Sequence, residues 1–496
     1  MSLTDKNSFR TQEKKDMKLS ELLKDIKTDS VYEDREVLTV TDKSSEIVEG
    51  CVFVCIKGGR FDGHSVAAKA QMLGAAAVIC EHSVGVENEI IVENTRSAYS
   101  KICAAYFGNP SSKLHLIGVT GTNGKTTTTF IIKSILETLG EKVGLVGTVK
   151  NCVGEKEYEA SLTTPDSKDL QKLFSEMVYD NCKYCVMEVS SQALAQCRVD
   201  GCHFDAAIFT NLTQDHLDYH GTIENYMAAK HKLFEISDRA IINADDSASE
   251  YMVEGTDCEV TTFSVKSDFA DYTAKNIVHK SARVQYDLVG EDNIGRAHVN
   301  IPGGFTVYNS MGAVICLTKL GFEFSSVLSA LRICMGVPGR VEIVPTETEY
   351  TVIIDYAHTP DGLENVISAM REVSEARIIT VFGCGGDRDS TKRPIMGKVA
   401  GDLSDIAVVT SDNPRTEDPD AIIDQIIAGM TDCKAKIVRI TDRTEAIRYA
   451  LGEAKKDDVV LLCGKGHETY QVLADGKIHF DEREIVKEIL NETAAE

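Results

Sequence analysis

A glycine-rich turn between an apolar segment and a helical segment constrains the fold of this 496-residue chain most strongly. Residues 114–119 (LHLIGV) have the composition of a buried strand, and TGTNGKT follows directly. Apolar residues then recur at helical spacing until Gly140 can end the helix: Phe130, Ile131, Ile135, Leu136 and Leu139. Glycines in such a turn let backbone N–H groups converge on phosphate oxygens at the helix N-terminus. The segment therefore predicts a βα unit that binds nucleotide phosphates.

The loop also carries the side chains that a nucleotide needs. Lys125 is placed to reach the β- and γ-phosphates, and the Thr126 hydroxyl is placed to bind Mg²⁺. The strict G-x-x-x-x-G-K-T pattern requires glycine where Val119 stands, so the generic motif is only partly met. The alternative is an ordinary glycine turn, but packing alone hardly explains G-K-T-T after a buried strand. The predicted ATP-loop residues are Gly121, Thr122, Asn123, Gly124, Lys125, Thr126 and Thr127.

The chain is too long for one hydrophobic core, and at about 150 residues per domain its length predicts three domains. Residues 1–93 alternate helical and β-branched segments without a glycine loop, which predicts a small α/β domain. Residues 94–343 contain the loop and are expected to form a central domain with a mainly parallel sheet. In residues 344–496, apolar runs such as TVIIDYAH and DIAVVTSD alternate with helical patterns. This alternation predicts a Rossmann-like, doubly wound parallel sheet, and the whole chain is of the α/β class.

Composition disfavours several classes of function. The 77 Asp and Glu residues outnumber the 53 Lys and Arg, and the net charge of -24 disfavours a nucleic-acid or anionic-membrane surface. The first sixteen residues are polar, and no stretch has about 18 uninterrupted apolar residues. We therefore expect a cytoplasmic protein without membrane insertion. The fifteen cysteines lie in strand-like apolar runs, which predicts reduced core residues.

Three residues beyond the loop are candidates for a metal site. Glu188 ends the apolar run YCVMEV, a poor position for an unpaired carboxylate and a good one for a Mg²⁺ ligand beside a phosphate loop. His216 falls in a polar loop, and Lys230 lies on the helix that follows. The alternatives are an edge glutamate in water, a surface histidine and a solvated helical lysine. The residues alone leave both interpretations open.

Charged residues also follow the apolar runs of the last third. Asp355 and His358 follow TVIIDYAH, Arg388 lies in GCGGDRD, Arg415 in SDNPR and Glu468 in GKGHE. Ligands of doubly wound sheets bind outside the carboxyl ends of the strands, so these side chains are expected to face one site. Two arginines with a carboxylate suit an amino acid, because guanidinium groups pair bidentately with carboxylates. The alternative is that they are loop charges that cap helices.

Taken together, the motifs resemble those of the Mur ligases. They occur in the family's order over nearly the whole chain: FVCIKGGRFDGH, TGTNGKTTT, LTTPD, MEVSSQAL, NLTQDHLDYHG, AAKHKLF, GRVE, DYAHTPD, GCGGDRD, DNPR and GKGHE. The resemblance implies an ATP-dependent amide ligase of peptidoglycan precursor synthesis. The first domain would hold uridine diphosphate, the second ATP and the third the incoming amino acid. It further implies Mg²⁺ as the metal, ATP as a co-substrate and a monomeric protein.

The resemblance implies roles for individual residues as well. Lys125, His216 and Lys230 would be catalytic, and the metal would be bound by Thr126, Glu188, His216 and a carbamylated Lys230. Besides the loop, the nucleotide would contact Asn309, Arg340, Asp355 and His358. The muramoyl-peptide substrate would contact Ser44, Thr163, Thr164, Ser190, Gln196 and Arg198. The amino acid would be held by Arg388, Asp412, Asn413, Arg415, Gly464 and Glu468.

DNPR is the family's signature for members that add meso-diaminopimelate to UDP-N-acetylmuramoyl-L-Ala-D-Glu through an acyl phosphate. Lysine-adding relatives lack the arginine of this motif, and lysine has no second carboxylate for Arg415 to bind. We therefore expect diaminopimelate. The alternatives are an L-lysine-adding ligase, a folylpolyglutamate-synthetase-like ligase, and an NTPase of regulation or transport that needs no amino acid.

Three positions depart from the family's pattern. Lys43-Ser44-Ser45 replaces the family's D-S-R near the uridine site, so only Ser44 carries over there. Gln192 stands where a histidine is usual, and Thr306 replaces an asparagine.

Overall fold

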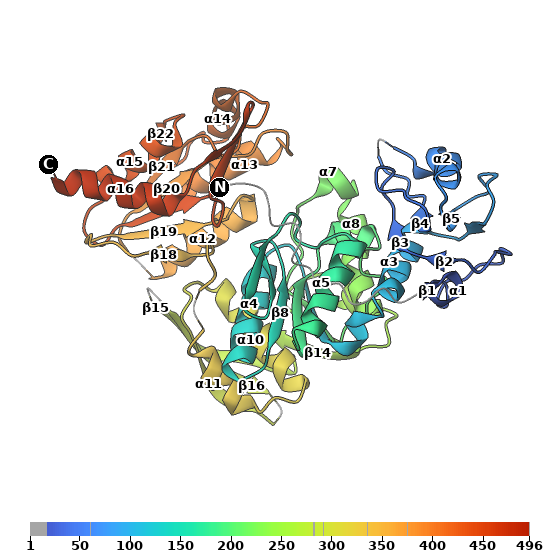
Figure 1. The fold of residues 1–496 in the computed structure, drawn as a ribbon. Helices are drawn as coiled ribbons and strands as arrows, with labels where there is room; N and C mark the ends of the chain where they lie inside the picture. Colours follow the sequence, from blue (N-terminus) through green and yellow to red (C-terminus); the bar gives the residue numbers. More distant parts are fainter. Residues whose placement is uncertain are drawn as a thin grey trace. The chain divides into compact units, whose positions relative to one another are not determined.

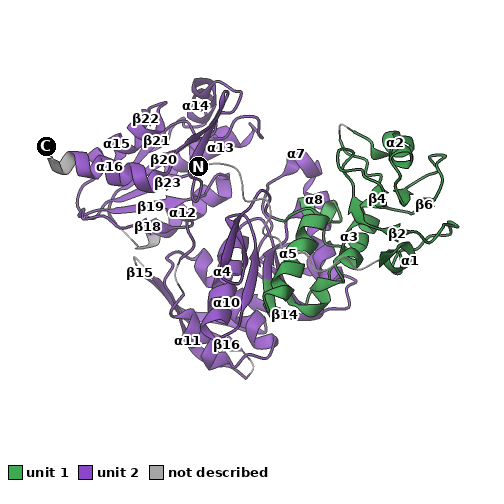
Figure 2. Cartoon of the chain, viewed as in Figure 1, with its two compact units in different colours: residues 1–116, 164–185, 192–204 green, residues 117–163, 186–191, 205–496 purple. Residues whose placement is uncertain are grey.

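The computed structural model describes residues 17–59, 61–280, 283–290, 292–334, 336–373 and 375–495 (Figure 1). The chain forms two compact units (Figure 2). Unit 1 contains residues 1–116, 164–185 and 192–204, and unit 2 contains residues 117–163, 186–191 and 205–496. The first sixteen residues, for which the sequence predicts no apolar leader, lie outside the described residues. The domain boundaries at residues 93 and 343 stay a prediction.

Unit 1 is built around a parallel sheet of order β3-β4-β5-β6 (Thr39–Thr41, Cys51–Val54, Ala77–Cys80 and Glu89–Ile91). Successive residues of a strand point to opposite faces, so β4 contributes to two cores. Val52 and Val54 pack with α1 (Leu19–Leu22) and α3 (Thr95–Tyr106), whereas Phe53 packs with α2 (Ala67–Met72). The predicted α/β character of this segment is confirmed. Its other elements are β1 (Met17–Lys18), β2 (Glu36–Val37), η1 (Gly63–Val66), η2 (Pro110–Lys113) and α5 (Ser167–Tyr179).

The sheet that carries the glycine-rich loop has the order β10-β9-β8-β11-β7-β12-β13-β14-β15-β16-β17. Parallel pairing runs from β7 through β12, β13 and β14 to β15, and antiparallel strands extend both edges. The strands in chain order are β7 (His115–Thr120), β8 (Val143–Val146), β9 (Lys150–Val153), β10 (Lys156–Glu159), β11 (Tyr184–Glu188), β12 (Ala206–Phe209), β13 (Arg239–Asn243), β14 (Glu259–Ser264), β15 (Tyr272–Lys280), β16 (Arg283–Gly290) and β17 (Ile294–Val299). The helices are α4 (Lys125–Thr138), α6 (Ser191–Ala195), α7 (Leu217–His220), α8 (Ile223–Glu235), α9 (Ser249–Val253), α10 (Phe305–Lys319) and α11 (Phe324–Leu331). The predicted mainly parallel central sheet is confirmed.

The second sheet of unit 2 has the order β18-β19-β23-β20-β21-β22. These strands are Glu342–Val344, Thr351–Asp355, Val459–Cys463, Ile378–Phe382, Ile406–Val409 and Lys436–Arg439. All neighbours from β19 to β22 are parallel, and β18 is an antiparallel edge. The hairpin of β24 (Tyr470–Leu473) and β25 (Gly476–His479) follows β23.

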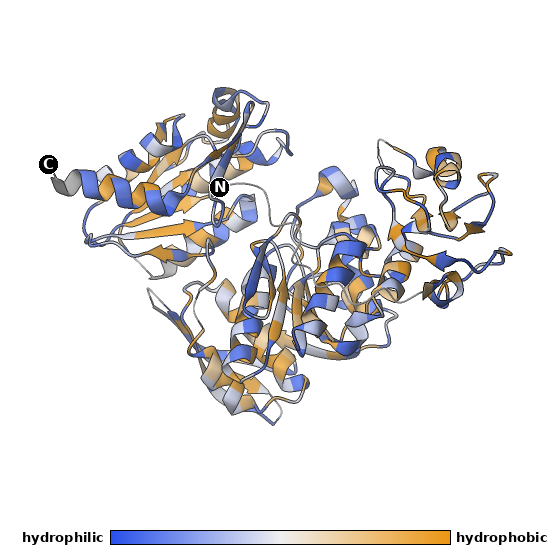
Figure 3. Ribbon diagram, in the orientation of Figure 1, coloured by the Kyte–Doolittle hydropathy of each residue, from blue (hydrophilic) through white to orange (hydrophobic). Residues whose placement is uncertain are grey.

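Helices cover both faces of this second sheet. Ile353 of β19 packs in a core with α12 (Pro360–Val373), α13 (Lys392–Leu403) and α14 (Pro419–Ile427). Its neighbours Val352 and Ile354 pack with α15 (Arg443–Glu453) and α16 (Glu482–Ala495). Figure 3 shows the resulting band of apolar residues along the strands. The predicted doubly wound, Rossmann-like sheet is therefore confirmed.

Two further findings concern the class of protein. All fifteen cysteines are free thiols, and all but Cys258 and Cys433 are buried, as predicted for core residues. No helix in the described ranges is long and apolar enough to cross a membrane.

Candidate functional site

The glycine-rich loop joins β7 to α4 in a conformation that requires its glycines. Gly121 has φ +145°, and a Cβ there would lie 1.9 Å from Thr210 Oγ1. Gly124 has φ +86° at the start of α4, and a Cβ there would lie 2.4 Å from Asn309 Oδ1. Backbone conformation and space therefore both exclude a side chain at these positions. The loop packs closely against the end of β12 and against α10.

Hydrogen bonds from the segment after β12 hold the loop. The N–H of Thr122 donates to the carbonyl of Asn211 (2.8 Å), and the N–H of Asn123 donates to Asn211 Oδ1 (2.9 Å). Thr210 Oγ1 donates to the carbonyl of Asn123 (2.6 Å). Sequence reasoning did not single out Thr210 and Asn211, although Asn211 begins the NLTQDH motif and Thr210 directly precedes it. Their role in the loop depends on a contact between two parallel strands.

Lys125 begins α4, and its ammonium lies against the loop backbone. Nζ donates to the carbonyls of Gly121 (2.9 Å) and Thr122 (2.8 Å). Burial lowers the pKa of Lys125, and the carboxylates of Glu188 and Asp215 oppose that shift. A cation at this position can meet the phosphate oxygens of a nucleotide in the loop.

Glu188 ends β11 and is 1% exposed. Its carboxylate accepts hydrogen bonds from Thr126 Oγ1 (3.0 Å), Thr148 N (2.9 Å) and Thr148 Oγ1 (3.0 Å). A Cβ on Gly147 would lie 2.5 Å from Glu188 Oε1, so that glycine makes room for the carboxylate. The alternative of an edge glutamate in water is wrong. The structure brings Glu188 and Thr126 together at the start of α4.

Lys230 lies on α8 and is 1% exposed, so the alternative of a solvated lysine is wrong as well. Nζ donates to the carbonyl of Gly121 (2.8 Å) and lies 4.4 Å from the centre of the Tyr226 ring. Burial and the ammonium of Lys125 hold the pKa of Lys230 well below its usual range, and Asp215 opposes this shift. The lowered pKa favours the neutral amine, which is the nucleophilic form of lysine.

His216 precedes α7 with φ +54°, and its side chain is 42% exposed. Nε2 lies 3.5 Å from Asp215 Oδ2. Partial burial lowers the pKa of His216, although the Asp215 carboxylate raises it. The imidazole is therefore neutral near pH 7, the form that binds metal ions.

In the part of the chain that the structure describes, no three His, Cys, Asp or Glu side chains gather closely enough to hold a metal ion. A cation beside Glu188 would need further ligands of other kinds. The Thr126 hydroxyl is one such oxygen, and phosphate oxygens or a carbamate on a lysine are others. The buried, hydroxyl-bonded carboxylate of Glu188 fits a hard cation such as Mg²⁺.

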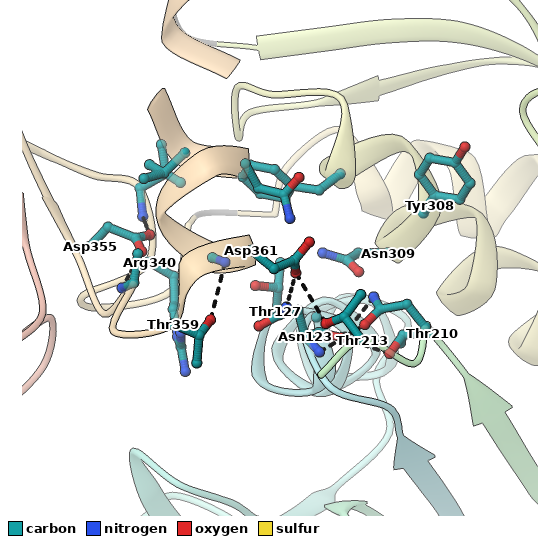
Figure 4. A pocket seen from close by; sticks show the side chains of 18 of the residues that line it. Asn123, Thr127, Thr210, Thr213, Tyr308, Asn309, Arg340, Asp355, Thr359 and Asp361 are labelled. Atoms are coloured by element: carbon teal, nitrogen blue, oxygen red, sulfur yellow. Dashed lines mark hydrogen bonds between the residues drawn. The ribbon is translucent and has the colours of Figure 1, made fainter. Parts of the chain in front are cut away.

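A cavity of about 330 Å³ lies beside the loop (Figure 4). Its lining includes Asn123, Gly124, Thr127, Asn309, Arg340, Asp355 and His358, which are all predicted nucleotide contacts. The loop residues Gly121, Thr122, Lys125 and Thr126 are not part of the lining. The structure thus gathers residues from both sheets of unit 2 around one cavity.

Arg340 and Asp355 form one wall of the cavity. Asp355 accepts hydrogen bonds from the N–H groups of Val341 (2.8 Å) and Ala357 (2.7 Å). Burial raises the pKa of Asp355, and the Arg340 guanidinium opposes the rise. That guanidinium lies 4.7 Å from the Tyr356 ring centre, and its Nε is buried without a hydrogen-bond partner among the described residues. Arg340 therefore has unused hydrogen-bonding capacity at the cavity.

His358 is neutral at physiological pH. Its Nδ1 donates to the carbonyl of Tyr356 (2.8 Å), which leaves Nε2 as an acceptor. Burial and the Lys392 ammonium lower the pKa of His358 to about 4.

Asp361, in the first turn of α12, is a cavity residue that sequence reasoning missed. Its carboxylate accepts hydrogen bonds from Asn123 Nδ2 and from Thr213 Oγ1 (Figure 4). Burial raises its pKa. Asp361 thereby connects the glycine-rich loop to the C-terminal sheet's first helix. Its place in the DYAHTPD motif, three residues after His358, is the signal that would have found it.

A second charged site lies in the loops after β21 and β23. Asn413 Nδ2 donates to Glu468 Oε2 (2.8 Å). Lys465, which is fully buried, donates to Asn413 Oδ1 (2.9 Å) and Glu468 Oε2 (3.1 Å), and its Nζ lies 3.4 Å from Asp412 Oδ1. Gly464 has φ +113°, and a Cβ there would lie 2.9 Å from Asp412 Oδ2. The structure brings the four predicted residues together, around a lysine that sequence reasoning missed although GKGHE contains it.

Two arginines belong to the same group of loops. A Cβ on Gly385 would lie 2.9 Å from Arg415 Nη1 and 3.8 Å from Arg388 Cγ, so both arginines flank that glycine. Arg415 has φ +54°; its N–H donates to the carbonyl of Val472 (3.1 Å) and its Nη1 to that of Gly386 (2.7 Å). Arg388 is exposed. Guanidinium groups can bind a carboxylate bidentately.

Three of the predicted muramoyl-peptide contacts gather in unit 1. Arg198 donates to the carbonyl of Thr164 (2.7 Å) and to Gln196 Oε1 (2.9 Å). Ser44 belongs to the same unit and is half-buried in the loop after β3. Thr163 and Ser190 belong to unit 2, where Thr163 Oγ1 lies 3.1 Å from Thr148 Oγ1.

Fold and site together define a phosphate-loop α/β protein with a second, charged site at the carboxyl ends of a doubly wound sheet. Family models match most of the chain: the Mur ligase middle domain at residues 119–317, the glutamate ligase domain of Mur ligases at 339–466, and the catalytic domain of the Mur ligase family at 36–109. The chain belongs to the Mur ligase family, and the resemblance of its motifs is confirmed.

Individual relatives are similar over nearly their whole length. The UDP-N-acetylmuramoyl-L-alanyl-D-glutamate--2,6-diaminopimelate ligase 1 of Clostridium acetobutylicum is 46% identical, over 96% of this chain and 100% of its own. A solved structure of a UDP-N-acetylmuramoyl-L-alanyl-D-glutamate--2,6-diaminopimelate ligase is 30% identical, with a TM-score of 0.72. The match covers 97% of this chain and 100% of that chain. A MurF ligase from Thermotoga maritima in complex with ADP shares the fold, with a TM-score of 0.61 and 21% identity. The match covers 92% of this chain and 97% of the MurF chain.

Proposed function

We propose that this chain is an ATP-dependent amide ligase that adds meso-diaminopimelate to UDP-N-acetylmuramoyl-L-alanyl-D-glutamate in peptidoglycan precursor synthesis. The full-length relatives that carry this activity in their names support the assignment over a folylpolyglutamate-type ligase. The observation that carries the choice of amino acid is the pair of arginines beside Gly385, next to the cluster of Asp412, Asn413 and Glu468.

The two kinds of charge in the site match the two charged groups at the end of diaminopimelate that is not joined to the dipeptide. Arg388 and Arg415 suit the distal carboxylate, because guanidinium groups bind carboxylates in two parallel hydrogen bonds. Glu468 and Asp412 suit the distal ammonium group. L-lysine would leave the arginines without a partner, and an unpaired polar site strongly disfavours the wrong substrate.

The nucleotide end of the reaction would occur at the glycine-rich loop. ATP transfers its γ-phosphoryl group to the terminal carboxylate of the dipeptide, and ADP leaves. The amine of diaminopimelate then attacks the acyl phosphate, and the C–O bond breaks as phosphate departs. Lys125 neutralises charge on the transferring group, and Arg340, with its unpaired Nε, contacts the nucleotide from the cavity.

Mg²⁺, when bound, would neutralise further phosphate charge. Glu188 and Thr126 would hold it at the start of α4, together with His216 and a carbamate on Lys230. The burial and lowered pKa of Lys230 support the carbamate, since only a neutral amine attacks CO₂. The proposed contacts of the muramoyl dipeptide are Ser44, Thr163, Thr164, Ser190, Gln196 and Arg198.

The proposal is tested by phosphate release from ATP. The purified chain is incubated with ATP, Mg²⁺ and UDP-N-acetylmuramoyl-L-Ala-D-Glu, with meso-diaminopimelate, L-lysine or no amine. Release only with diaminopimelate is expected. Release that needs no amine would identify an NTPase instead, and release with lysine alone would overturn the amino-acid assignment.

A further inference from the structure

Lys465 is a buried cation at the centre of the residues assigned to the incoming amino acid. It follows Gly464 in the loop after β23, and its side chain is fully buried. Its three N–H groups face three oxygens: Asn413 Oδ1 (2.9 Å), Glu468 Oε2 (3.1 Å) and Asp412 Oδ1 (3.4 Å). A lysine ammonium has three donors, so this arrangement uses its whole capacity. The side chain therefore has no donor left for a substrate.

These contacts fix the orientation of the neighbouring side chains. Asn413 Oδ1 accepts from Lys465 and from the N–H of Val472 (2.9 Å), so its amide NH₂ must face Glu468. Both hydrogen bonds of Glu468 reach Oε2. Within the described ranges, Oε1 accepts none. That oxygen has capacity to accept a hydrogen bond from an ammonium group.

Lys465 also sets the charge of the cluster. Two carboxylates and one ammonium leave a single net negative charge, which one substrate ammonium group balances. Without the lysine, the Asp412 and Glu468 carboxylates would repel each other with no cation between them.

We infer that Lys465 is a positioning residue for the amino-acid substrate, which orients Asn413 and Glu468 and balances one of the two carboxylate charges of Asp412 and Glu468. The inference rests on the proposed function, because it concerns the same site. It adds a residue that acts through its neighbours and has no contact of its own with diaminopimelate.

The test is steady-state kinetics of Lys465→Met, which removes the charge and keeps most of the volume. The KM for diaminopimelate should rise about 30-fold or more, because a buried charged group loses its partner, and the KM for ATP should change less than about threefold. Lys456→Met is the matched control, because Lys456 is exposed and lies 3.7 Å from Glu349 on the surface. It should behave like the wild type.

A double-mutant cycle separates positioning from a general structural defect. The cycle of Lys465→Met with Glu468→Gln should be non-additive, since both changes affect one contact. If Lys465→Met does not fold, Lys465→Arg keeps the charge but cannot place its donors on the same three oxygens, and its KM for diaminopimelate should rise at least about threefold.

The outcomes distinguish this inference from the proposed function. A wild-type chain that forms no amide product would contradict the function itself. An active wild type whose Lys465 variants keep the wild-type KM for diaminopimelate would overturn only the role of Lys465. Strictly additive effects in the double-mutant cycle would do the same.

Discussion

At the scale of single residues, Lys125 gives the most direct test of the nucleotide assignment. Its ammonium lies against Gly121 and Thr122 in the loop. Replacement by Ala should lower kcat by about 100-fold or more, as expected when one charge-stabilising group is lost, while the circular dichroism spectrum is unchanged. Lys133→Ala, on the same helix, is the control, because Lys133 pairs only with Glu137 one turn away. Wild-type turnover by the Lys125 variant would rule out the loop as the phosphate site.

Arg415 tests the choice of amino acid. Its backbone has φ +54°, which asparagine tolerates better than most residues, so Arg415→Asn removes the guanidinium with little backbone strain. The KM for diaminopimelate should rise about 30-fold or more, and the KM for ATP should stay within about twofold. Arg439→Ala is the control, since Arg439 is exposed and pairs with Asp420 at the surface. Equal effects on both KM values would argue against a carboxylate contact.

Lys230 gives a prediction about pH. With an ordinary pKa near 10.4, only about one lysine in 2,500 is neutral at pH 7. Burial holds the pKa of Lys230 well below that, so much more of it is neutral and can react with CO₂. NMR with ¹³C-bicarbonate should show a protein carbamate that disappears as the pH falls through the lowered pKa. The signal should be absent in Lys230→Met and present in Lys232→Met, which changes an exposed lysine of α8. A carbamate that survives in Lys230→Met would contradict the assignment.

Residues were predictable from sequence where their local segment carried the information. Glu188 is one example, because a carboxylate at the end of an apolar strand needs a partner, and the structure shows three donors around it. Lys465 was not predictable in this way. Its partners come from two loops more than fifty positions apart in sequence, and only the parallel pairing of strands brings them together. Asp361 was missed for the same reason.

At the scale of elements, the turn between β7 and α4 makes a prediction about stability. Gly121→Ala would place Cβ 1.9 Å from Thr210 Oγ1, whereas Gly140→Ala would meet no atom within 4 Å, although both glycines have positive φ. Gly140→Ala should therefore cost only about 1 kcal/mol of left-handed strain, and Gly121→Ala about 2–4 kcal/mol. Thermal unfolding of the two variants checks the difference. Equal midpoints would contradict the close packing of the loop.

The strands and helices of the parallel sheets were predictable because a buried strand appears in the sequence as a run of apolar residues, and a helix as apolar residues at helical spacing. TVIIDYAH became β19, and its alternating side chains fill both cores of the second sheet. The antiparallel extension of β15, β16 and β17 was not described by the sequence analysis. β16 alternates buried and half-buried residues, and that weaker pattern is harder to separate from loops.

At the scale of the whole molecule, the order of motifs predicted the family and its α/β architecture, because several of the motifs lie at strand ends where a ligand can bind. The limits of the domains were not predictable in the same way. Unit 1 collects residues from three separate stretches of the chain, and such a grouping depends on tertiary packing.

The central claim is that this ligase joins diaminopimelate to the muramoyl dipeptide. The most direct test is to measure the mass of the product. The chain is incubated with ATP, Mg²⁺, UDP-N-acetylmuramoyl-L-Ala-D-Glu and an equimolar mixture of meso-diaminopimelate and L-lysine, and the nucleotide products are analysed by mass spectrometry. We predict one product, whose mass is that of the dipeptide substrate plus diaminopimelate minus water. A product that contains lysine, or unchanged dipeptide after ATP is consumed, would contradict the claim.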